Sequence, residues 1–116
     1  MAMAKKNVSA PSYGEPVHEN QLRKGEVYFM VTYLDEARLV PQVKTLAFLG
    51  ENVGGKAKGS LWFQDAESFF ELGAYPHNKT GDTEIYRCQP TGLSNIYELD
   101  KAIKGLTRCL ERRSKK

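Results

Sequence analysis

The stretch Glu26–Leu34 constrains the fold most. It runs for nine residues without a glycine or proline and is rich in β-branched and aromatic types, which is typical of a β-strand. One face is apolar throughout: Val27, Phe29, Val31 and Tyr33. The other face is only partly polar, because it carries Tyr28, Met30 and Leu34. We therefore expect a strand that is covered on both faces.

Further strands and one short helix follow this segment. Three stretches have strand composition: Val43–Leu49 with Pro41 at its start, Leu61–Gln64, and Thr83–Cys88. Between the last two, Asp65–Gly73 predicts a helix, with Asp65 as its N-cap and Gly73 as its left-handed end. We expect its apolar side chains to point into the core: Phe69, Phe70 and Leu72.

The C-terminal segment allows two divisions. Its apolar residues step by three and four positions, as one face of a helix from Ser94 onward would: Ile96, Leu99, Ile103, Leu106 and Leu110. Alternatively, Asn95–Glu98 forms a fifth short strand and Asp100 caps a helix from Lys101 to about Arg113. We prefer the second division, since Asp100 is the better start signal. In both, we expect the apolar stripe to cover the sheet, with Gly105 weakening the helix.

These elements predict an α+β, mainly β domain. We expect an antiparallel meander of about four or five strands that curls into a small barrel, with one short helix and a C-terminal helix. The opening Leu22–Val27 resembles the start of SH3-like barrels, with its leucine, lysine-glycine turn and strand. We assign residues 1–20 to a flexible arm, 21–113 to a single globular domain and 114–116 to a basic tail.

Length and composition exclude several classes of protein. A chain of 116 residues that is 41% hydrophobic fits one folded domain, and no apolar run approaches the roughly 20 residues of a membrane span. Met1–Lys6 is not followed by the apolar region of a secretory signal. Cys88 and Cys109 lack metal or redox spacing and are too few for a disulfide scaffold. We expect Cys109, beside Leu106 and Leu110 on the C-terminal helix, to be a small core residue. We expect a cytoplasmic protein.

The net charge of +3 is unevenly distributed. Residues 11–100 carry a net charge of −5, whereas residues 101–116 carry +6. A basic helix end can meet a phosphate backbone or an acidic partner. The stronger explanation is that these residues complement the helix dipole and keep the chain soluble.

Motifs for chemistry are weak. Gly50–Ala57 matches the G-x-x-x-x-G-K of a P-loop, but Ala57 replaces the hydroxyl residue that holds Mg²⁺ and no helix pattern follows; we read it as a hairpin loop. His18 and His77 have no partner at metal-ligand spacing. Asp65 and Glu67 are explained by helix capping. Cys88 has no recognisable base beside it. We expect no cofactor and no metal site.

The sequence leaves three hypotheses for function. The first is a non-catalytic, monomeric binding module for a protein or peptide, through the basic helix, an exposed strand edge and aromatic loops. The second is an RNA or DNA accessory factor that uses the basic tail. The third is a small-molecule enzyme that uses His77 and the loop 50–60. The candidate partner-binding residues are Arg108, Arg112, Arg113, Lys115, Lys116, Trp62 and Tyr28.

Overall fold

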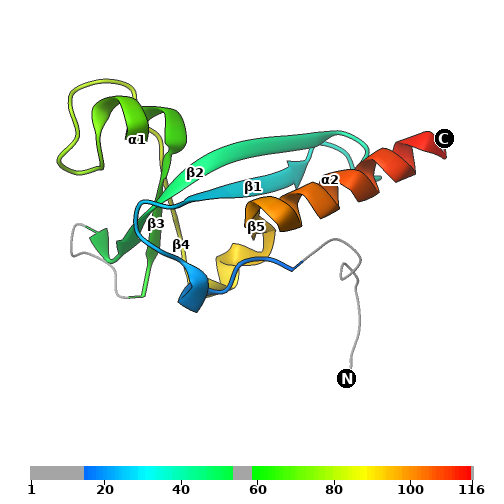
Figure 1. Cartoon of the computed structure of the whole chain (residues 1–116), viewed down its shortest axis with the longest axis horizontal. Coiled ribbons are helices and arrows are strands. Elements are labelled where there is room, and N and C mark those ends of the chain that lie inside the picture. Colours follow the sequence, from blue (N-terminus) through cyan, green and yellow to red (C-terminus); the bar gives the residue numbers. More distant parts are fainter. Residues whose placement is uncertain (1–14, 54–58, 116) are drawn as a thin grey trace.

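An antiparallel sheet dominates the computed structural model, which describes residues 15–53 and 59–115 (Figure 1). The sheet has five strands in the order β4-β3-β2-β1-β5. Their bounds are β1 Val27–Tyr33, β2 Pro41–Glu51, β3 Leu61–Asp65, β4 Ile85–Cys88 and β5 Ile96–Tyr97. Two α-helices and two 3-10 helices complete the described chain: α1 Ala66–Leu72, α2 Leu99–Ser114, η1 Glu19–Gln21 and η3 Pro90–Asn95. The mainly β, α+β class and the order of a short strand followed by a helix at the C-terminus are confirmed. Asp100 is not the helix cap: α2 begins at Leu99 after Glu98, and Asp100 lies in its first turn, where a carboxylate favours the helix dipole instead.

The sheet is open. Strands β1 to β4 form the predicted meander, and β5 returns to pair with the other side of β1, at Phe29 and Met30. The edge strands β4 and β5 have four and two residues and lie at opposite ends of the strand order, so they do not pair. The barrel closure that Leu22–Val27 suggested is therefore not observed.

The main core lies on one face of the sheet. Tyr28, Leu46 and Phe63 are buried there, with the Phe48 and Phe63 rings 5.3 Å apart. Val17 joins this core and its N–H donates to the carbonyl of Ile96 at 2.8 Å. The packed part of the chain thus includes Val17, inside the segment expected to be a flexible arm, because an apolar side chain and a backbone donor both find partners there.

Helix α1 begins and ends at the predicted residues. The Asp65 carboxylate accepts from the Ser68 N–H at 3.0 Å, and Gly73 ends the helix at φ +96°. Its orientation differs from the prediction. Ala66 and Ser68 are the buried side chains, while Phe70 is 69% exposed. The polar face of α1 lies toward the sheet because the side-chain NH₂ of Gln64, on β3, donates to Ser68 Oγ.

Helix α2 packs on β1 and β5 with its small residues. Ala102, Gly105 and Cys109 are buried, and Cys109 is the core residue that the sequence predicted. The expected apolar stripe does not cover the sheet: Leu99, Ile103 and Leu110 are 58%, 53% and 65% exposed. The physical reason is size, since small side chains let a helix approach a strand more closely than leucines do.

Candidate functional site

The first candidate surface is the α2 stripe, which we define as Leu99, Ile103, Leu106 and Leu110. At 3.6 residues per turn these side chains share one flank of the helix. Leu106 is half-buried and the other three are more than half exposed. Lys101, on the opposite flank, lines a cavity together with Ser94 and Tyr97 from the β5 side.

The stripe therefore faces the β2 side of the sheet. Strand β1 lies between β2 and β5, so a helix flank turned away from β5 is turned toward β2. There, Val43 on β2 pairs with the buried Val31 of β1 and is itself 44% exposed. Clustered exposed apolar side chains such as those of the stripe mark interaction surfaces more often than scattered ones do.

Helix α2 as a whole is basic. Residues 99–115 carry six basic and two acidic side chains, hence a net charge of +4. Two of the predicted contact residues are engaged within the chain. Arg108 pairs with Glu111 at 3.2 Å. Arg112 donates from Nε and Nη2 to the carbonyl of Arg38 at 3.0 and 2.6 Å, and lies 5.5 Å from the centre of the Tyr33 ring.

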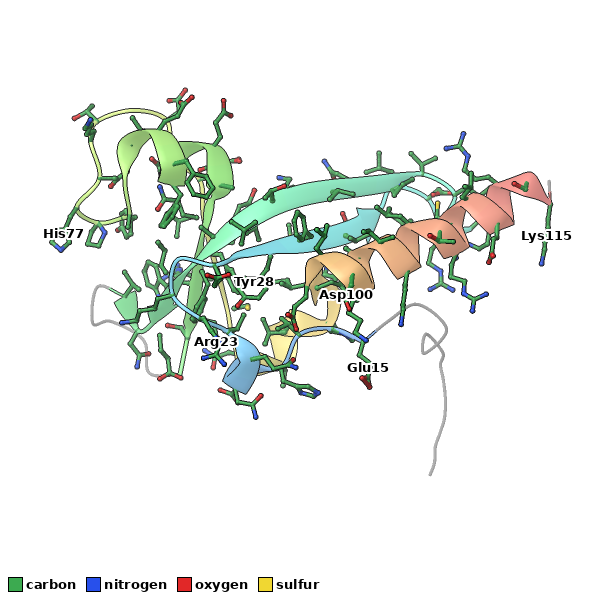
Figure 2. The ribbon with its side chains drawn as sticks, in the orientation of Figure 1. Glu15, Arg23, Tyr28, His77, Asp100 and Lys115 are labelled. Atoms are coloured by element: carbon green, nitrogen blue, oxygen red, sulfur yellow. The ribbon has the colours of Figure 1, made fainter. Side chains whose placement is uncertain are left out.

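Other predicted contact residues lie elsewhere. Arg113 and Lys115 are exposed at the end of α2 (Figure 2), and Lys116 lies outside the described residues. Trp62 is 6% exposed, donates from Nε1 to Ser60 Oγ at 2.8 Å and stacks on Tyr75 at 6.1 Å.

Tyr28, the remaining predicted residue, is 4% exposed; its hydroxyl accepts from the Arg23 N–H at 2.9 Å and so ties the N-terminal segment to β1. The structure places Arg108, Arg112 and Arg113 on α2 and Lys115 just after it, but places Trp62 and Tyr28 inside the protein.

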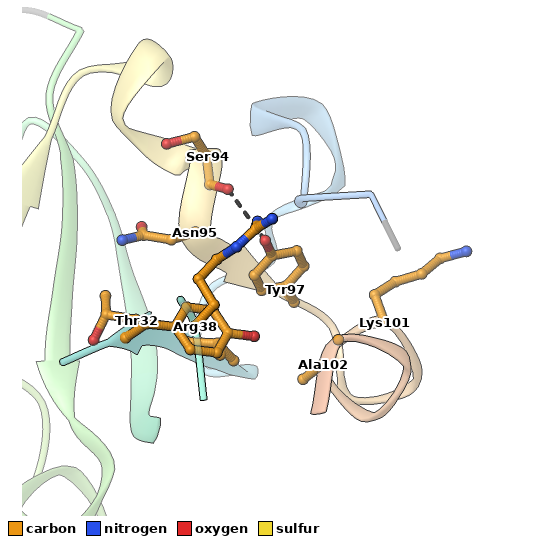
Figure 3. Close-up of a pocket in the computed structure, with 10 residues that line it drawn as sticks. Thr32, Arg38, Ser94, Asn95, Tyr97, Lys101 and Ala102 are labelled. Atoms are coloured by element: carbon orange, nitrogen blue, oxygen red, sulfur yellow. Dashed lines mark hydrogen bonds between the residues drawn. The ribbon is translucent and has the colours of Figure 1, made fainter. Parts of the chain in front are cut away.

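The second candidate surface is a cavity of about 360 Å³ beside the start of α2 (Figure 3). Its walls come from the end of β1, the β1–β2 turn, the segment before β5, and α2. The polar and charged residues that line it are Thr32, Tyr33, Arg38, Ser94, Asn95, Tyr97 and Lys101. The Tyr97 hydroxyl donates to the carbonyl of Ser94 at 3.4 Å. Burial, helped by the nearby Tyr33, raises the pKa of Tyr97 despite the opposing charge of Arg38.

No pattern in the sequence predicts this cavity. Arg38 lies in a turn, Tyr33 ends a strand, and Tyr97 and Lys101 belong to later elements. No local spacing joins residues from such separate segments, so the signal exists only in the fold.

The groups considered for catalysis are His77, Cys88 and the loop 50–60. His77 is exposed in the loop after α1, at the opposite end of the molecule from Lys115 (Figure 2). Burial raises the pKa of the Cys88 thiol, which disfavours the reactive thiolate. The P-loop-like match Gly50–Ala57 lies partly outside the described residues, which lack positions 54–58.

The described residues contain neither a metal-binding cluster nor a membrane-spanning helix. No group of three or more histidine, cysteine or acidic side chains is arranged to hold a metal ion. None of the described helices is long and apolar enough to cross a membrane.

Comparisons with known proteins give no relative: no family model, no curated protein and no solved structure matches this chain.

Proposed function

We propose that the protein is a non-catalytic binding module that docks an amphipathic helix of a protein partner along the α2 stripe. The observation that supports this is the exposure of Leu99, Ile103 and Leu110 on one helix flank. Helix recognition of this kind uses apolar anchors spaced by three and four residues. The α2 stripe has that spacing, from 99 to 103, 106 and 110.

The stripe is held in place by the packing beneath it. Ala102, Gly105 and Cys109 are buried against the sheet, and turning the leucines inward would force large side chains into a space that fits small ones. The stripe thus stays available to a partner. Completing the burial of half-exposed leucines and isoleucines stabilises a complex by roughly 1 kcal/mol for each side chain.

Charge indicates which helix would fit. The net charge of +4 over residues 99–115 favours an acidic partner over a basic one. The same charge disfavours a second copy of α2, since two basic helices would repel each other at short range. The proposal is therefore an acidic amphipathic helix from a different protein, bound to a monomer of this one.

A titration followed by amide NMR tests this proposal. The probe is a designed helical peptide with leucines along one face and glutamates around them, compared with a scrambled peptide of the same composition. We expect saturable shifts at Ile103, Leu106 and Val43 with the first peptide only. Ile103→Glu should weaken binding about tenfold or more, because it places a charge in an apolar contact. Lys104→Gln, which changes the net charge equally but lies off the stripe, should weaken it much less.

Three other results would overturn the proposal. One is equal binding of the scrambled peptide, which would show charge attraction alone. Another is a short RNA that shifts Arg113 and Lys115 at about 150 mM salt, an ionic strength that screens weak attraction, while neither peptide binds. The third is a micromolar dimer by sedimentation equilibrium that Ile103→Glu dissociates, which would make a second copy the occupant.

A further inference from the structure

We infer that the cavity lined by Arg38, Tyr97 and Lys101 binds a small organic acid with a planar ring, held by its carboxylate or phosphate. This site is separate from the α2 stripe, because Lys101 lies on the opposite flank of the helix. The inference does not depend on the proposed function.

The cavity lies where β5 has not yet begun. Strand β5 pairs with β1 only at Phe29 and Met30, whereas β1 continues to Tyr33. The segment before β5 is the 3-10 helix η3, which does not run on as a strand beside the end of β1. A space therefore opens between the end of β1, η3 and the first turns of α2.

The backbone of β1 contributes polar groups to this space. The N–H of Leu34 donates to the carbonyl of Val40, and the N–H of Phe48 to that of Glu26. Antiparallel pairs alternate between bonded and non-bonded, so the even-numbered residues of β1 bond to β2. The N–H and carbonyl of Tyr33 consequently face away from β2, toward the cavity side.

The charge of the cavity is positive. Among the described residues, its lining includes Arg38 and Lys101 and no aspartate or glutamate. The nearby Asp35 carboxylate accepts from the N–H groups of Leu39 and Val40, at 2.9 to 3.1 Å, within the β1–β2 turn. Figure 3 shows Arg38 reaching from this turn toward Ser94 and Tyr97, with the Lys101 side chain extending outward at the rim. A guanidinium has five N–H donors, so it can hold an anion and keep contacts with the protein.

The backbone of Arg38 is held in position. Two N–H groups of the Arg112 side chain donate to the backbone carbonyl of Arg38, and the Arg112 guanidinium also packs on the Tyr33 ring. The turn that carries Arg38 is thereby fastened to α2, which carries Lys101. A backbone segment that is already ordered in the free protein loses less conformational entropy when the ligand binds.

The remaining lining residues indicate the rest of the ligand. The Tyr33 and Tyr97 side chains line the cavity, and aromatic rings favour contact with another flat ring. Thr32, Ser94 and Asn95 add hydroxyl and amide groups. A volume of about 360 Å³ lies near the lower end of small-ligand pockets, which start at about 300 Å³. One or two fused rings with one acidic group suit this space.

Paired probes test the inference by amide NMR at about 150 mM salt, which screens weak surface attraction. The acids are 4-hydroxybenzoate and adenosine monophosphate, and their neutral counterparts are 4-hydroxybenzyl alcohol and adenosine. We expect at least one acid to give saturable shifts at Tyr33, Tyr97 and Ala102, with its neutral counterpart about tenfold weaker or silent. Inorganic phosphate should bind more weakly than adenosine monophosphate, because it lacks the ring.

Matched arginine variants identify the group that holds the anion. Arg38→Gln should weaken binding of the acid about tenfold, in line with the loss of one charge-assisted hydrogen bond. Arg38→Lys should weaken it less. Arg113→Gln removes the same charge from an exposed position on α2 and should have little effect. Circular dichroism of each variant verifies that the fold is kept.

The inference would be overturned if neither acid gave saturable shifts at the cavity up to about 10 mM. Equal binding of acid and neutral counterpart would also overturn it, as would equal losses in Arg38→Gln and Arg113→Gln. Ile103→Glu should leave binding of the acid unchanged, so failure of this inference and failure of the proposed function can be told apart.

Discussion

The two α-helices are attached to the sheet by different means. Helix α1 is fastened by directed hydrogen bonds around one buried amide: Gln64 donates to Ser68 Oγ and the Gly73 carbonyl, and accepts from the Tyr75 N–H at 2.9 Å. Helix α2 packs through Ala102, Gly105 and Cys109, which offer little beyond close contact. Both arrangements leave large apolar side chains outside, Phe70 on α1 and the α2 stripe on α2.

The difference teaches where each helix is sensitive to change. A buried hydrogen-bond network tolerates little, because every partner left behind is an unsatisfied polar group. A contact between small residues is sensitive to added volume instead. The exposed flank of α2 should tolerate either kind of change in the free protein.

The largest effect is expected at Gln64. It is 0% exposed, and Gln64→Ala removes three hydrogen bonds and leaves a cavity. We expect the free energy of unfolding to fall by about 3 to 5 kcal/mol, measured by urea denaturation. Gln42→Ala, at an exposed position on β2, should change it by less than about 0.5 kcal/mol. A loss below about 1 kcal/mol at Gln64 would contradict the role of the network.

A medium effect separates the two flanks of α2. Ala102→Leu adds volume where the helix meets the sheet, and should lower the free energy of unfolding by about 1 to 3 kcal/mol. Ile103→Ala, at the next residue but 53% exposed, should change it by less than about 1 kcal/mol in the free protein. Denaturation of both variants provides the comparison. If the order of the two effects were reversed, the burial pattern of α2 would be wrong.

The smallest effect concerns the start of α1. Burial favours a raised pKa for Asp65, but hydrogen bonds from Ser68 and from the Glu84 N–H outweigh it and lower the pKa below the usual 3.8. The carboxylate thus contributes stability that is present above about pH 4 and is lost as the pH falls through the lower folded-state pKa.

The Asp65→Asn side chain keeps an oxygen that can cap α1 but has no ionisable group. We expect wild type to lose more stability than Asp65→Asn between about pH 5 and pH 2.5, and Asp65→Ala to cost about 1 kcal/mol at pH 7. Thermal unfolding across this pH range measures both effects. Parallel curves for wild type and Asp65→Asn would show that the carboxylate contributes nothing specific.

Much of the fold follows from local sequence. The run Glu26–Leu34 predicts β1 to within a residue at each end, and Asp65 and Gly73 mark the ends of α1. Asn95–Glu98 predicts β5, whose observed bounds are Ile96–Tyr97. These predictions succeed because strand composition and capping depend on residues only a few positions apart.

The errors share one cause. Periodicity predicts an apolar flank on α2 but does not tell whether that flank or the small residues beside it will meet the sheet. In the same way, Phe70 is apolar on a short helix whose inward direction is set by Gln64, and the open sheet follows from how short β4 and β5 turn out to be. Each outcome depends on partners distant in sequence.

The sequence alone therefore determined the order, type and approximate bounds of the elements, the capping of α1 and the burial of Cys109. Only the tertiary structure decided which flank of α2 faces outward, that the sheet stays open, and that Arg38, Tyr97 and Lys101 line one cavity. Backbone preference is a local property of a few residues, whereas burial and site assembly are choices among shapes contributed by segments far apart in the chain.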